Sequence, residues 1–297
     1  MTQIVCQQIA PRIADLAGNC RLTIQAIRAA VDSGADVVVL PELATSGYVF
    51  ESREEAASVA ITSGHSLFTQ WAVEAARGPS LVVGGFCELG DDGLLYNSAA
   101  MVDGSGLRAI YRKIHLWDRE KLIFEPGSQS PPVLDTKAGR IGVLVCYDLE
   151  FPEMTRTLAL ADADLIVVPT NWPLVDRPPG ERPPEVLIAM AAARTNRVFI
   201  ACCDRAGAER GQEWTSGTTI IDQSGWVIAT THEEGPASVD VDLTLARMKA
   251  LTGLSDVLAD RRPELYSAVT MANDRQVKPR RASVDQVSAN KSSGPNR

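Results

Sequence analysis

The stretch GRIGVLVCYDLEFPE, residues 139–153, shows how this chain passes from strand to helix. It begins with a short apolar run, residues 141–145, whose length and β-branched content are typical of a buried strand. Cys146 follows directly, and a helix is expected to begin near Pro152, because proline is favoured in the first helical turn. This order is typical of α/β proteins, and it places the Cys146 sulfur at the end of a sheet.

Further short apolar runs of the same character predict more strands along the chain. They cover residues 4–6, 37–40, 81–86, 99–102, 165–168, 198–202, 218–221 and 227–230. Apolar residues at helical spacing separate several of these runs and predict helices over residues 22–31, 66–77, 152–161 and 184–195. Glycine-containing turns at residues 103–106 and 223–225 predict hairpins, so the sheet is expected to be mixed.

The domain organisation follows from the absence of any break in the pattern. No composition change or long linker divides residues 1–273, which predicts a single domain with strands buried on both faces. Residues 274–297 are polar and end in SANKSSGPNR. Such a composition cannot bury enough apolar surface to offset chain entropy, so a disordered tail is predicted.

Composition excludes several classes of partner. The chain has 297 residues, of which 45% are hydrophobic, and 29 Lys and Arg stand against 37 Asp and Glu, a net charge of −8. This negative charge argues against binding to nucleic acid. The start, MTQIVCQQIAP, lacks a basic region before a long apolar stretch, and no run of about 18 uncharged apolar residues occurs. No membrane association and a cytoplasmic location are therefore expected.

The distribution of the cysteines also agrees with a cytoplasmic location. The chain has six of them and no CxxC pair, and most lie within apolar runs. This distribution is typical of reduced, buried thiols. Neither a disulfide framework nor a zinc site is indicated.

Two charged residues stand at strand ends in the same way as Cys146. Glu42 follows the apolar run in VVVLPELATSGY, and Lys113 follows a strand-like segment in YRKIHLWDRE. Taken singly, Cys146 is most simply a small buried hydrophobic residue, Glu42 a loop carboxylate and Lys113 a solvated charge. A carboxylate, an ammonium and a thiol that all stand at the ends of strands instead predict one assembled site.

The chemistry of a nucleophilic thiol gives these three residue types complementary roles. A thiol needs a nearby cation, a helix N-terminus or a base before it attacks carbon. Lys113 would supply a cation, and Glu42 at the edge of a buried strand would have a raised pKa suited to a base. The three histidines, His65, His115 and His232, lie in turns or loops that give no sign of a Cys–His pair.

These segments resemble the nitrilase superfamily of carbon-nitrogen hydrolases, whose members carry Glu, Lys and Cys in that chain order. The resemblance runs from about residue 4 to residue 242 and includes LPELATSGY, LLYNSAAMVDGSG, YRKIHLWD, FEPG, GRIGVLVCYDLEFPE, RTLALADADLIVVPTNW and SGTTIIDQSGWVIA. It implies a four-layer αββα sandwich of the nitrilase type, a homodimer or higher homo-oligomer, and a reaction without metal or cofactor.

The resemblance also implies roles for individual residues. Glu42 is expected to be the general base, Lys113 the cation that stabilises the oxyanion, and Cys146 the nucleophile. Glu120, in REKLIFEPG, occupies the place of a second glutamate that the family often carries. The backbone N–H of Tyr147 is expected to add an oxyanion donor. Tyr147 and the aspartate after it replace the Trp-Glu of typical nitrilases, which tilts the interpretation toward the amidase-like branch.

The expected substrate is a small linear aliphatic amide, converted through a Cys thioester to a carboxylic acid and ammonia. Tyr48, Trp117, Asn171 and Trp172 lie in loops after strands and are candidates for the substrate pocket, although aromatic residues there are as often packing. Glu150 is either a solvated carboxylate near a helix start or a group that attracts the amine of an ω-amino amide.

Other functions are consistent with the same residues. A thiolate also adds to a nitrile carbon, and an N-carbamoyl amine or amino acid would release carbon dioxide as well as ammonia. A catalytically inactive binding protein would leave the Glu, Lys and Cys set without a purpose. A thiol redox sensor would use Cys202 and Cys203, but neighbouring residues of a strand point to opposite faces, so their disulfide would be strained.

Overall fold

The computed structural model describes residues 1–231 and 235–271. The described chain divides into two units, residues 1–259 and a second unit that begins at residue 260. In the second unit the described part holds a turn of 3₁₀-helix, η3 (Pro263–Leu265), and a short helix, α7 (Ser267–Thr270). The predicted tail at residues 274–297 lies outside the described residues, and the domain limit at residue 273 stays a prediction.

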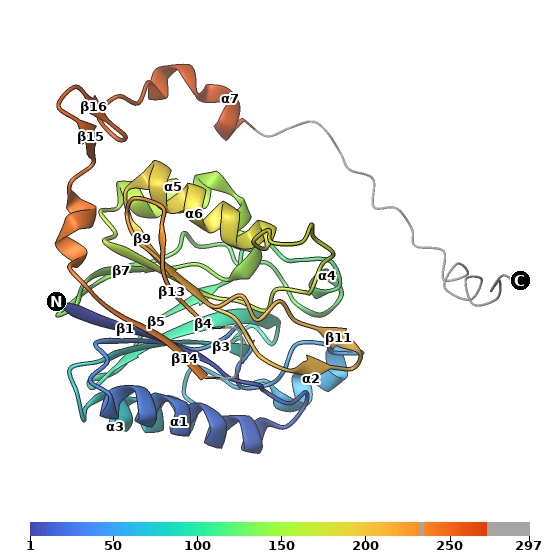
Figure 1. The fold of residues 1–297 in the computed structure, drawn as a ribbon. Coiled ribbons are helices and arrows are strands. Elements are labelled where there is room, and N and C mark those ends of the chain that lie inside the picture. Colours follow the sequence, from blue (N-terminus) through green and yellow to red (C-terminus); the bar gives the residue numbers. More distant parts are fainter. Residues whose placement is uncertain (232–234, 272–297) are drawn as a thin grey trace, which may run out of the picture. The chain divides into compact units, whose positions relative to one another are not determined.

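Two six-stranded sheets make up the first unit (Figure 1). The first sheet has the order β14 (Gly235–Val241), β1 (Thr2–Gln8), β2 (Val37–Val39), β3 (Leu81–Leu89), β4 (Leu95–Asp103), β5 (Gly106–Arg112). The second has the order β13 (Val227–Thr230), β12 (Thr219–Ile221), β9 (Phe199–Cys203), β8 (Leu165–Pro169), β7 (Gly139–Val143), β6 (Val133–Thr136). Two small hairpins accompany them, β10 (Ala208–Glu209) with β11 (Gln212–Glu213) and β15 (Ala250–Thr252) with β16 (Ser255–Asp256).

Helices cover the outer face of each sheet (Figure 1). The first sheet is covered by α1 (Leu16–Asp32) and α3 (Ser66–Ala75), and the second by α5 (Pro152–Leu160) and α6 (Pro184–Asn196). The result is the expected four-layer αββα sandwich, so the fold class is confirmed. The shorter helical elements are α2 (Arg53–Val59), α4 (Glu120–Ile123), η1 (Cys146–Glu150) and η2 (Leu243–Arg247).

The alternation of side chains along β2 shows how the layers are held together. Val37 and Val39 point into the core between the two sheets, whereas Val38 packs into the core beneath α1 and α3. All three are fully buried. Each buried valine contributes roughly 1.5–3 kcal/mol of transfer free energy, so a strand apolar on both faces belongs at the centre of the sandwich.

The strands missing from the prediction lie at the edges of the sheets. All nine apolar runs form strands, and the pairing is mixed as expected, with β1, β2 and β3 parallel and the hairpins antiparallel. Two longer strands were not predicted, namely β6 and β14, and each ends its sheet. The edge strand β5 was predicted only by the hairpin turn at residues 103–106 and as the segment before Lys113. An edge strand keeps polar, partly exposed positions, so it lacks the continuous apolar run that identifies a central strand.

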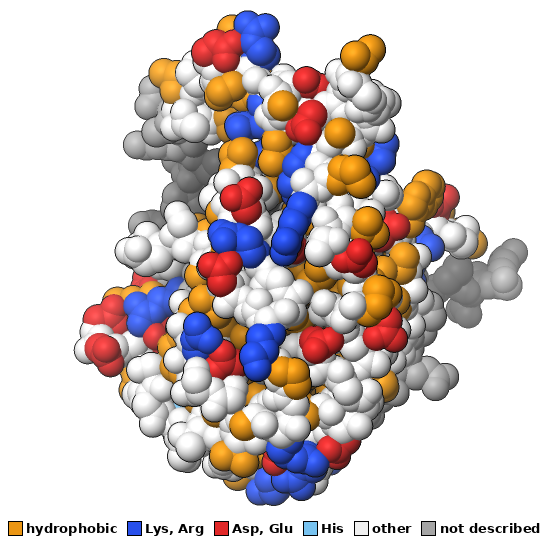
Figure 2. All heavy atoms as spheres, turned by 90° about the vertical axis from the view of Figure 1, so that its left-hand side faces the viewer, with side chains coloured by type: hydrophobic (Ala, Val, Ile, Leu, Met, Phe, Trp, Pro, Cys, Tyr) orange, Lys and Arg blue, Asp and Glu red, His pale blue; other side chains and the backbone are white. Residues whose placement is uncertain are grey.

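The face of the molecule in Figure 2 carries charges of both signs. On the face shown in Figure 2, basic and acidic side chains are interspersed rather than gathered into one stripe. Within the described part of the chain, no helix is both long and apolar enough to cross a bilayer.

Candidate active site

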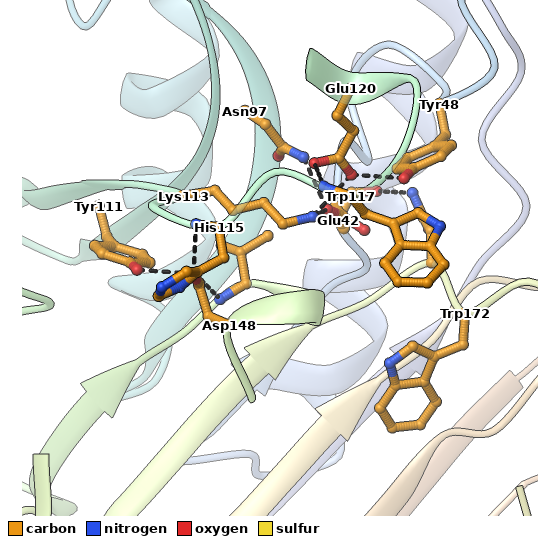
Figure 3. A network of polar contacts seen from close by, with 12 residues as sticks. Glu42, Tyr48, Asn97, Tyr111, Lys113, His115, Trp117, Glu120, Asp148 and Trp172 are labelled. Atoms are coloured by element: carbon orange, nitrogen blue, oxygen red, sulfur yellow. Dashed lines mark hydrogen bonds and ion pairs between the residues drawn. The ribbon is translucent and has the colours of Figure 1, made fainter. Parts of the chain in front are cut away.

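Lys113 is the centre of the site. It follows edge strand β5 directly, and its side chain is completely buried. Its ammonium nitrogen Nζ lies 2.7 Å from Glu42 Oε1 and 2.8 Å from Glu120 Oε1 (Figure 3). Burial lowers the pKa of Lys113, but Glu120 and Glu42 outweigh it and raise that pKa above the ordinary lysine value. The structure therefore brings two of the predicted carboxylates onto one permanent cation.

Glu42 is held from several sides at the end of β2. Its Oε1 accepts from Asn97 Nδ2 at 2.8 Å as well as from Lys113, and its backbone oxygen accepts from Asn171 Nδ2 at 2.9 Å. The neighbouring strand β3 passes so close that a Cβ on Gly85 would lie 2.3 Å from Leu43 N, so only glycine fits there. These contacts fix the carboxylate in the interior.

The second carboxylate oxygen of Glu42 is the chemically open group of the site. Glu42 is fully buried, and its Oε2 has no hydrogen-bond partner among the described residues. Burial raises the pKa of Glu42 to about 7, against the lowering effect of Lys113 and with a further rise from Glu120. A carboxylate with a free oxygen and a pKa near neutrality can both accept and return a proton.

Unlike Glu42, Glu120 accepts hydrogen bonds on both of its carboxylate oxygens. It stands at the start of α4 and accepts from Lys113, from the Tyr48 hydroxyl at 2.5 Å and from the backbone N–H of Trp117 at 3.0 Å. Burial and the Glu120 charge raise the pKa of Tyr48, so the hydroxyl keeps its proton and donates it in this bond. Glu120 is thus placed to orient Lys113.

Cys146 lies in a strained turn directly after the strand that ends in Val143. Its φ is +46°, in the left-handed region that costs a non-glycine residue roughly 1–2 kcal/mol. Its side chain is buried, and the backbone N–H of Asn171 donates to its sulfur. A residue held in such a turn presents its side chain outward from the strand end, as a nucleophile requires.

The electrostatics of Cys146 place the proton on sulfur in the resting state. Burial raises the pKa of Cys146 well above its ordinary value, Glu42 raises it further, and Lys113 lowers it. The dipole of helix α5 has a limited effect on the thiol, because the rest of the 3₁₀ turn η1 lies between Cys146 and Pro152, the first residue of α5. The arrangement therefore favours removal of the thiol proton by a base during attack over a thiolate formed in advance.

The predicted substrate-binding residues fall into different settings. Tyr48, Trp117 and Glu120 line one cavity of ≈ 120 Å³ together with aromatic residues that include Trp214. Asn171 supports Glu42 and Cys146 instead of opening onto that cavity. Trp172 is 3% exposed and packs over Gly217, so its ring serves mainly as packing.

The two remaining predicted residues lie on the 3₁₀ turn η1. Tyr147, whose backbone N–H was the expected oxyanion donor, has its ring edge-on to Trp117 at 4.8 Å between centroids. Glu150 is exposed, and its pKa is raised by partial removal from water and by Glu185. Both residues therefore lie on the same 3₁₀ turn as Cys146, at the edge of the site.

Several residues of the site were missed by the sequence analysis. Asn97 stands in the middle of β4, and Glu209 accepts the backbone N–H groups of Tyr48 and Val49 at 2.8 and 2.6 Å. Trp214 stacks edge-on against Tyr48. A buried amide inside an apolar strand was the signal for Asn97, whereas Glu209 and Trp214 lie in ordinary loop sequence and act only through distant contacts.

The donor set bears on metal binding. The described residues include no group of three or more His, Cys, Asp or Glu side chains able to hold a metal ion. In the described part of the chain, the cation that contacts Glu42 Oε1 and Glu120 Oε1 is the Lys113 ammonium.

Comparison with known proteins agrees with this geometry. Residues 4–252 match the carbon-nitrogen hydrolase family, and the chain belongs to that family. It is 36% identical over 269 residues to a nitrilase of Pyrococcus abyssi, covering 90% of this chain and 99% of that protein. It is 35% identical over 257 residues to an (R)-stereoselective amidase of a Pseudomonas species, covering 86% of this chain and 89% of the relative.

Solved structures place the chain beside amidases of the nitrilase superfamily. The NitN amidase of Nesterenkonia sp. AN1 superposes with a TM-score of 0.74 at 27% identity, covering 91% of this chain and 100% of that one. A mutant of the same amidase carries acrylamide added at its active-site cysteine, with a TM-score of 0.73. The recognised superfamily and its amidase-like branch are thus confirmed, and the protein is a carbon-nitrogen hydrolase.

Proposed function

We propose that this protein hydrolyses a small linear aliphatic amide to a carboxylic acid and ammonia through a thioester on Cys146. The observation that carries the proposal is the buried contact of one ammonium with two carboxylates, of which Glu42 keeps a free oxygen. The site thereby holds a cation for a developing oxyanion and a base for a thiol within one enclosed space.

The first half of the cycle forms the thioester. Glu42 takes the thiol proton as Cys146 Sγ bonds to the amide carbon, and the carbonyl oxygen becomes an oxyanion. Lys113 Nζ and the backbone N–H of Tyr147 receive that oxyanion. Protonated Glu42 then gives its proton to the amide nitrogen, the C–N bond breaks, and ammonia leaves.

The second half releases the acid. Glu42 removes a proton from a water molecule, whose oxygen attacks the thioester carbon. The C–S bond breaks, Glu42 returns the proton to sulfur, and the carboxylic acid departs. Throughout both halves Glu120 holds Lys113 by its 2.8 Å contact, so the ammonium does not follow Glu42 as that carboxylate changes charge.

The site environment supports an amide with a short chain. The cavity of ≈ 120 Å³ beside Glu120 is bordered by the rings of Tyr48, Trp117 and Trp214. A space of this size and apolar character suits a few methylene groups.

A finer proposal concerns the far end of the substrate. Glu150 is an exposed carboxylate on the turn of the nucleophile, and Glu185 lies near enough to raise its pKa. Two carboxylates at the rim would favour a cationic group, so we propose a preference for ω-amino amides.

A substrate panel tests the main proposal. Ammonia and carbon dioxide release are measured with aliphatic amides, the corresponding nitriles and N-carbamoyl compounds, for the wild type and for Cys146→Ala. We expect ammonia from amides with the wild type alone, and an acyl adduct on Cys146 by intact-mass measurement. Carbon dioxide release would indicate an N-carbamoyl hydrolase, and acid formed directly from nitriles alone would indicate a nitrilase. Turnover of every substrate by Cys146→Ala would refute the thiol mechanism.

The ω-amino preference is tested by one substrate pair. We expect a higher kcat/KM for 5-aminopentanamide than for pentanamide, because only the former carries a cation. Glu150→Gln should reduce that ratio and leave pentanamide turnover unchanged. Equal kcat/KM values in the wild type would end the ω-amino proposal without affecting the amidase proposal.

Assembly and location stay predictions. The family resemblance predicts a homodimer or higher homo-oligomer, and the composition predicts a cytoplasmic location without nucleic acid or membrane partners. Sedimentation velocity of the purified chain would measure the oligomeric state.

A further inference from the structure

Asp148 is a buried carboxylate that the proposed reaction does not use. It stands two residues after Cys146 and is fully buried. Its Oδ2 accepts from the Tyr111 hydroxyl at 2.8 Å and from the backbone N–H of Val145 at 3.2 Å. Its Oδ1 lies 3.0 Å from the backbone nitrogen and 2.9 Å from Nδ1 of His115 (Figure 3).

The direction of each bond follows from the chemistry of the groups. A carboxylate only accepts, so His115 carries its ring proton on Nδ1. Burial and the Asp148 charge raise the pKa of Tyr111, so the phenol remains protonated and donates. The His115 ring is held in place by stacking on Phe151, with 3.6 Å between centroids. Four donors therefore converge on one carboxylate.

The partners of Asp148 are arranged around the two proposed catalytic groups. Tyr111 and His115 stand two residues before and two residues after Lys113. Val145 immediately precedes Cys146. The Asp148 carboxylate thus bonds to residues on both sides of Lys113 and to the residue before Cys146. The Lys113 and Cys146 segments are more than 30 positions apart in the sequence.

The strained turn at Cys146 is also stabilised by the hydrogen bonds of Asp148. Cys146 has a φ of +46°, and such backbone strain persists only where surrounding contacts over-determine the conformation. Asp148 closes the turn twice, since its own backbone N–H donates to Val145 O at 3.0 Å while its side chain takes the Val145 N–H. Removing the carboxylate would free the turn and loosen the Lys113 segment at the same time.

We propose that Asp148 is a positioning residue that fixes the distance between the Lys113 ammonium and the Cys146 sulfur. This inference rests on the proposed function of Lys113 and Cys146. Asp148 touches neither substrate nor reacting atom in the cycle, and it acts through Tyr111, His115 and Val145. A displacement of about 1 Å in such a constellation is enough to reduce turnover by about 10²-fold.

The test compares two buried aspartates. Asp148→Asn keeps the shape of the side chain but turns one acceptor oxygen into a donor, which opposes the Val145 N–H. Asp164→Asn makes the same change at another buried aspartate. Asp164 lies at the start of β8 and is ion-paired to Arg247. We expect kcat of Asp148→Asn per mole of folded protein to fall about 10²-fold with KM within about twofold of the wild type. Asp164→Asn should keep the wild-type kcat.

A second variant covers the case in which Asp148→Asn does not fold. Tyr111→Phe removes one of the four donors and retains the ring, and it should lower kcat roughly threefold to tenfold, the range that one hydrogen bond supplies. The proposal is overturned by a folded Asp148→Asn with wild-type kcat. It is equally overturned by a Tyr111→Phe with wild-type kcat when Asp148→Asn is unfolded.

A readout that needs no substrate separates this inference from the proposed function. The rate of Cys146 alkylation by iodoacetamide is measured against pH by peptide mass spectrometry. Lys113 lowers the pKa of the thiol, so an ammonium held less closely should move the midpoint of the labelling profile upward, by about one unit at most. An unchanged midpoint in folded Asp148→Asn would contradict the proposal even if the wild type hydrolysed no amide in the panel.

Discussion

Two buried carboxylates, Asp164 and Glu42, lie next to opposite ends of strand β8 and differ in how their oxygens are hydrogen-bonded. At its start, Asp164 is 1% exposed and has both oxygens engaged, since Arg247 donates to each at 3.0 and 2.9 Å and the Arg140 N–H donates to Oδ2 at 3.0 Å. Beyond its end, Thr170 O lies 3.4 Å from the backbone nitrogen of Glu42, which is also fully buried but keeps one oxygen unpartnered.

The difference separates a structural carboxylate from one that can do chemistry. A buried charge is tolerated where hydrogen bonds and an opposite charge replace water, as around Asp164. Glu42 shares one ammonium with Glu120, so a single positive charge serves two carboxylates. Burial raises the pKa of Glu42 to about 7, because the shared ammonium only partly offsets it and Glu120 raises it further, and Glu42 is left able to exchange a proton.

A large effect is expected when the cation beside Glu42 or beside Asp164 is removed. Lys113→Met leaves no ammonium for the oxyanion and should lower kcat by about 10²–10³-fold or more. Arg247→Met leaves Asp164 buried without its partner and should cost about 1–3 kcal/mol of unfolding free energy, with kcat unchanged in the folded protein. Amide turnover and urea unfolding measure the two effects. Equal losses of kcat in both variants would remove the distinction.

A second contrast exchanges each carboxylate for its amide. Glu42→Gln removes the proposed base and should lower kcat by about 10²–10⁴-fold. It also removes a buried charge with an unsatisfied oxygen, so the unfolding free energy at pH 8 should not fall. Asp164→Asn should show the reverse, with kcat retained and a loss of about 1–3 kcal/mol. The Asn amide nitrogen would take the place of one carboxylate oxygen, so a donor would face either Arg247 Nε at the Oδ1 position or the Arg140 N–H and Arg247 Nη2 at the Oδ2 position. A marked loss of stability in Glu42→Gln would contradict this account.

The smallest effect is a shift along the pH axis. A base must be deprotonated, so kcat/KM should rise with pH around a midpoint of about 7, the pKa of Glu42. The charge on Glu120 raises the pKa of Glu42, so Glu120→Gln should move this midpoint to lower pH, whatever its effect on the maximal rate. A midpoint that stays in place or moves upward would show that a different group titrates.

The same shift has a consequence for stability. The folded-state pKa of Glu42 is raised above its unfolded value, so the folded protein binds this proton more tightly. The resulting stabilisation is complete below about pH 4.5 and is lost as pH rises through about 7. Activity at Glu42 is thus gained over the pH range in which its contribution to stability disappears.

Much of the fold was readable from the sequence, because central strands and amphipathic helices leave strong periodic signals. β2 is apolar on both faces, and α5 begins at Pro152, so both were predictable from local patterns. The edge strands β6 and β14 were not, since their polar, half-exposed positions resemble loops. Their strand character comes from pairing with a neighbour, which local sequence does not encode.

The residues of the site can be divided in the same way, into those that local sequence indicates and those whose contacts arise only on folding. Glu42, Lys113 and Cys146 stand out in the sequence because each follows a strand, and their chain order together with the surrounding motifs matches them to a family. Sequence could not show that Asn97 would share the carboxylate of Glu42, or that Asp148 would join the segments of Lys113 and Cys146. The contacts of Asn97 with Glu42, and of Asp148 with Tyr111 and His115, link positions 33 to 55 residues apart and exist only in the folded chain.

By itself, then, the sequence determined which chemical groups the protein possesses and which strands carry them, because those properties are local. The tertiary structure decided the protonation behaviour of these groups. The pKa of Glu42 depends on complete removal from water and on the number of charges around one ammonium. Both are set by packing between two sheets, which no single segment of the chain contains.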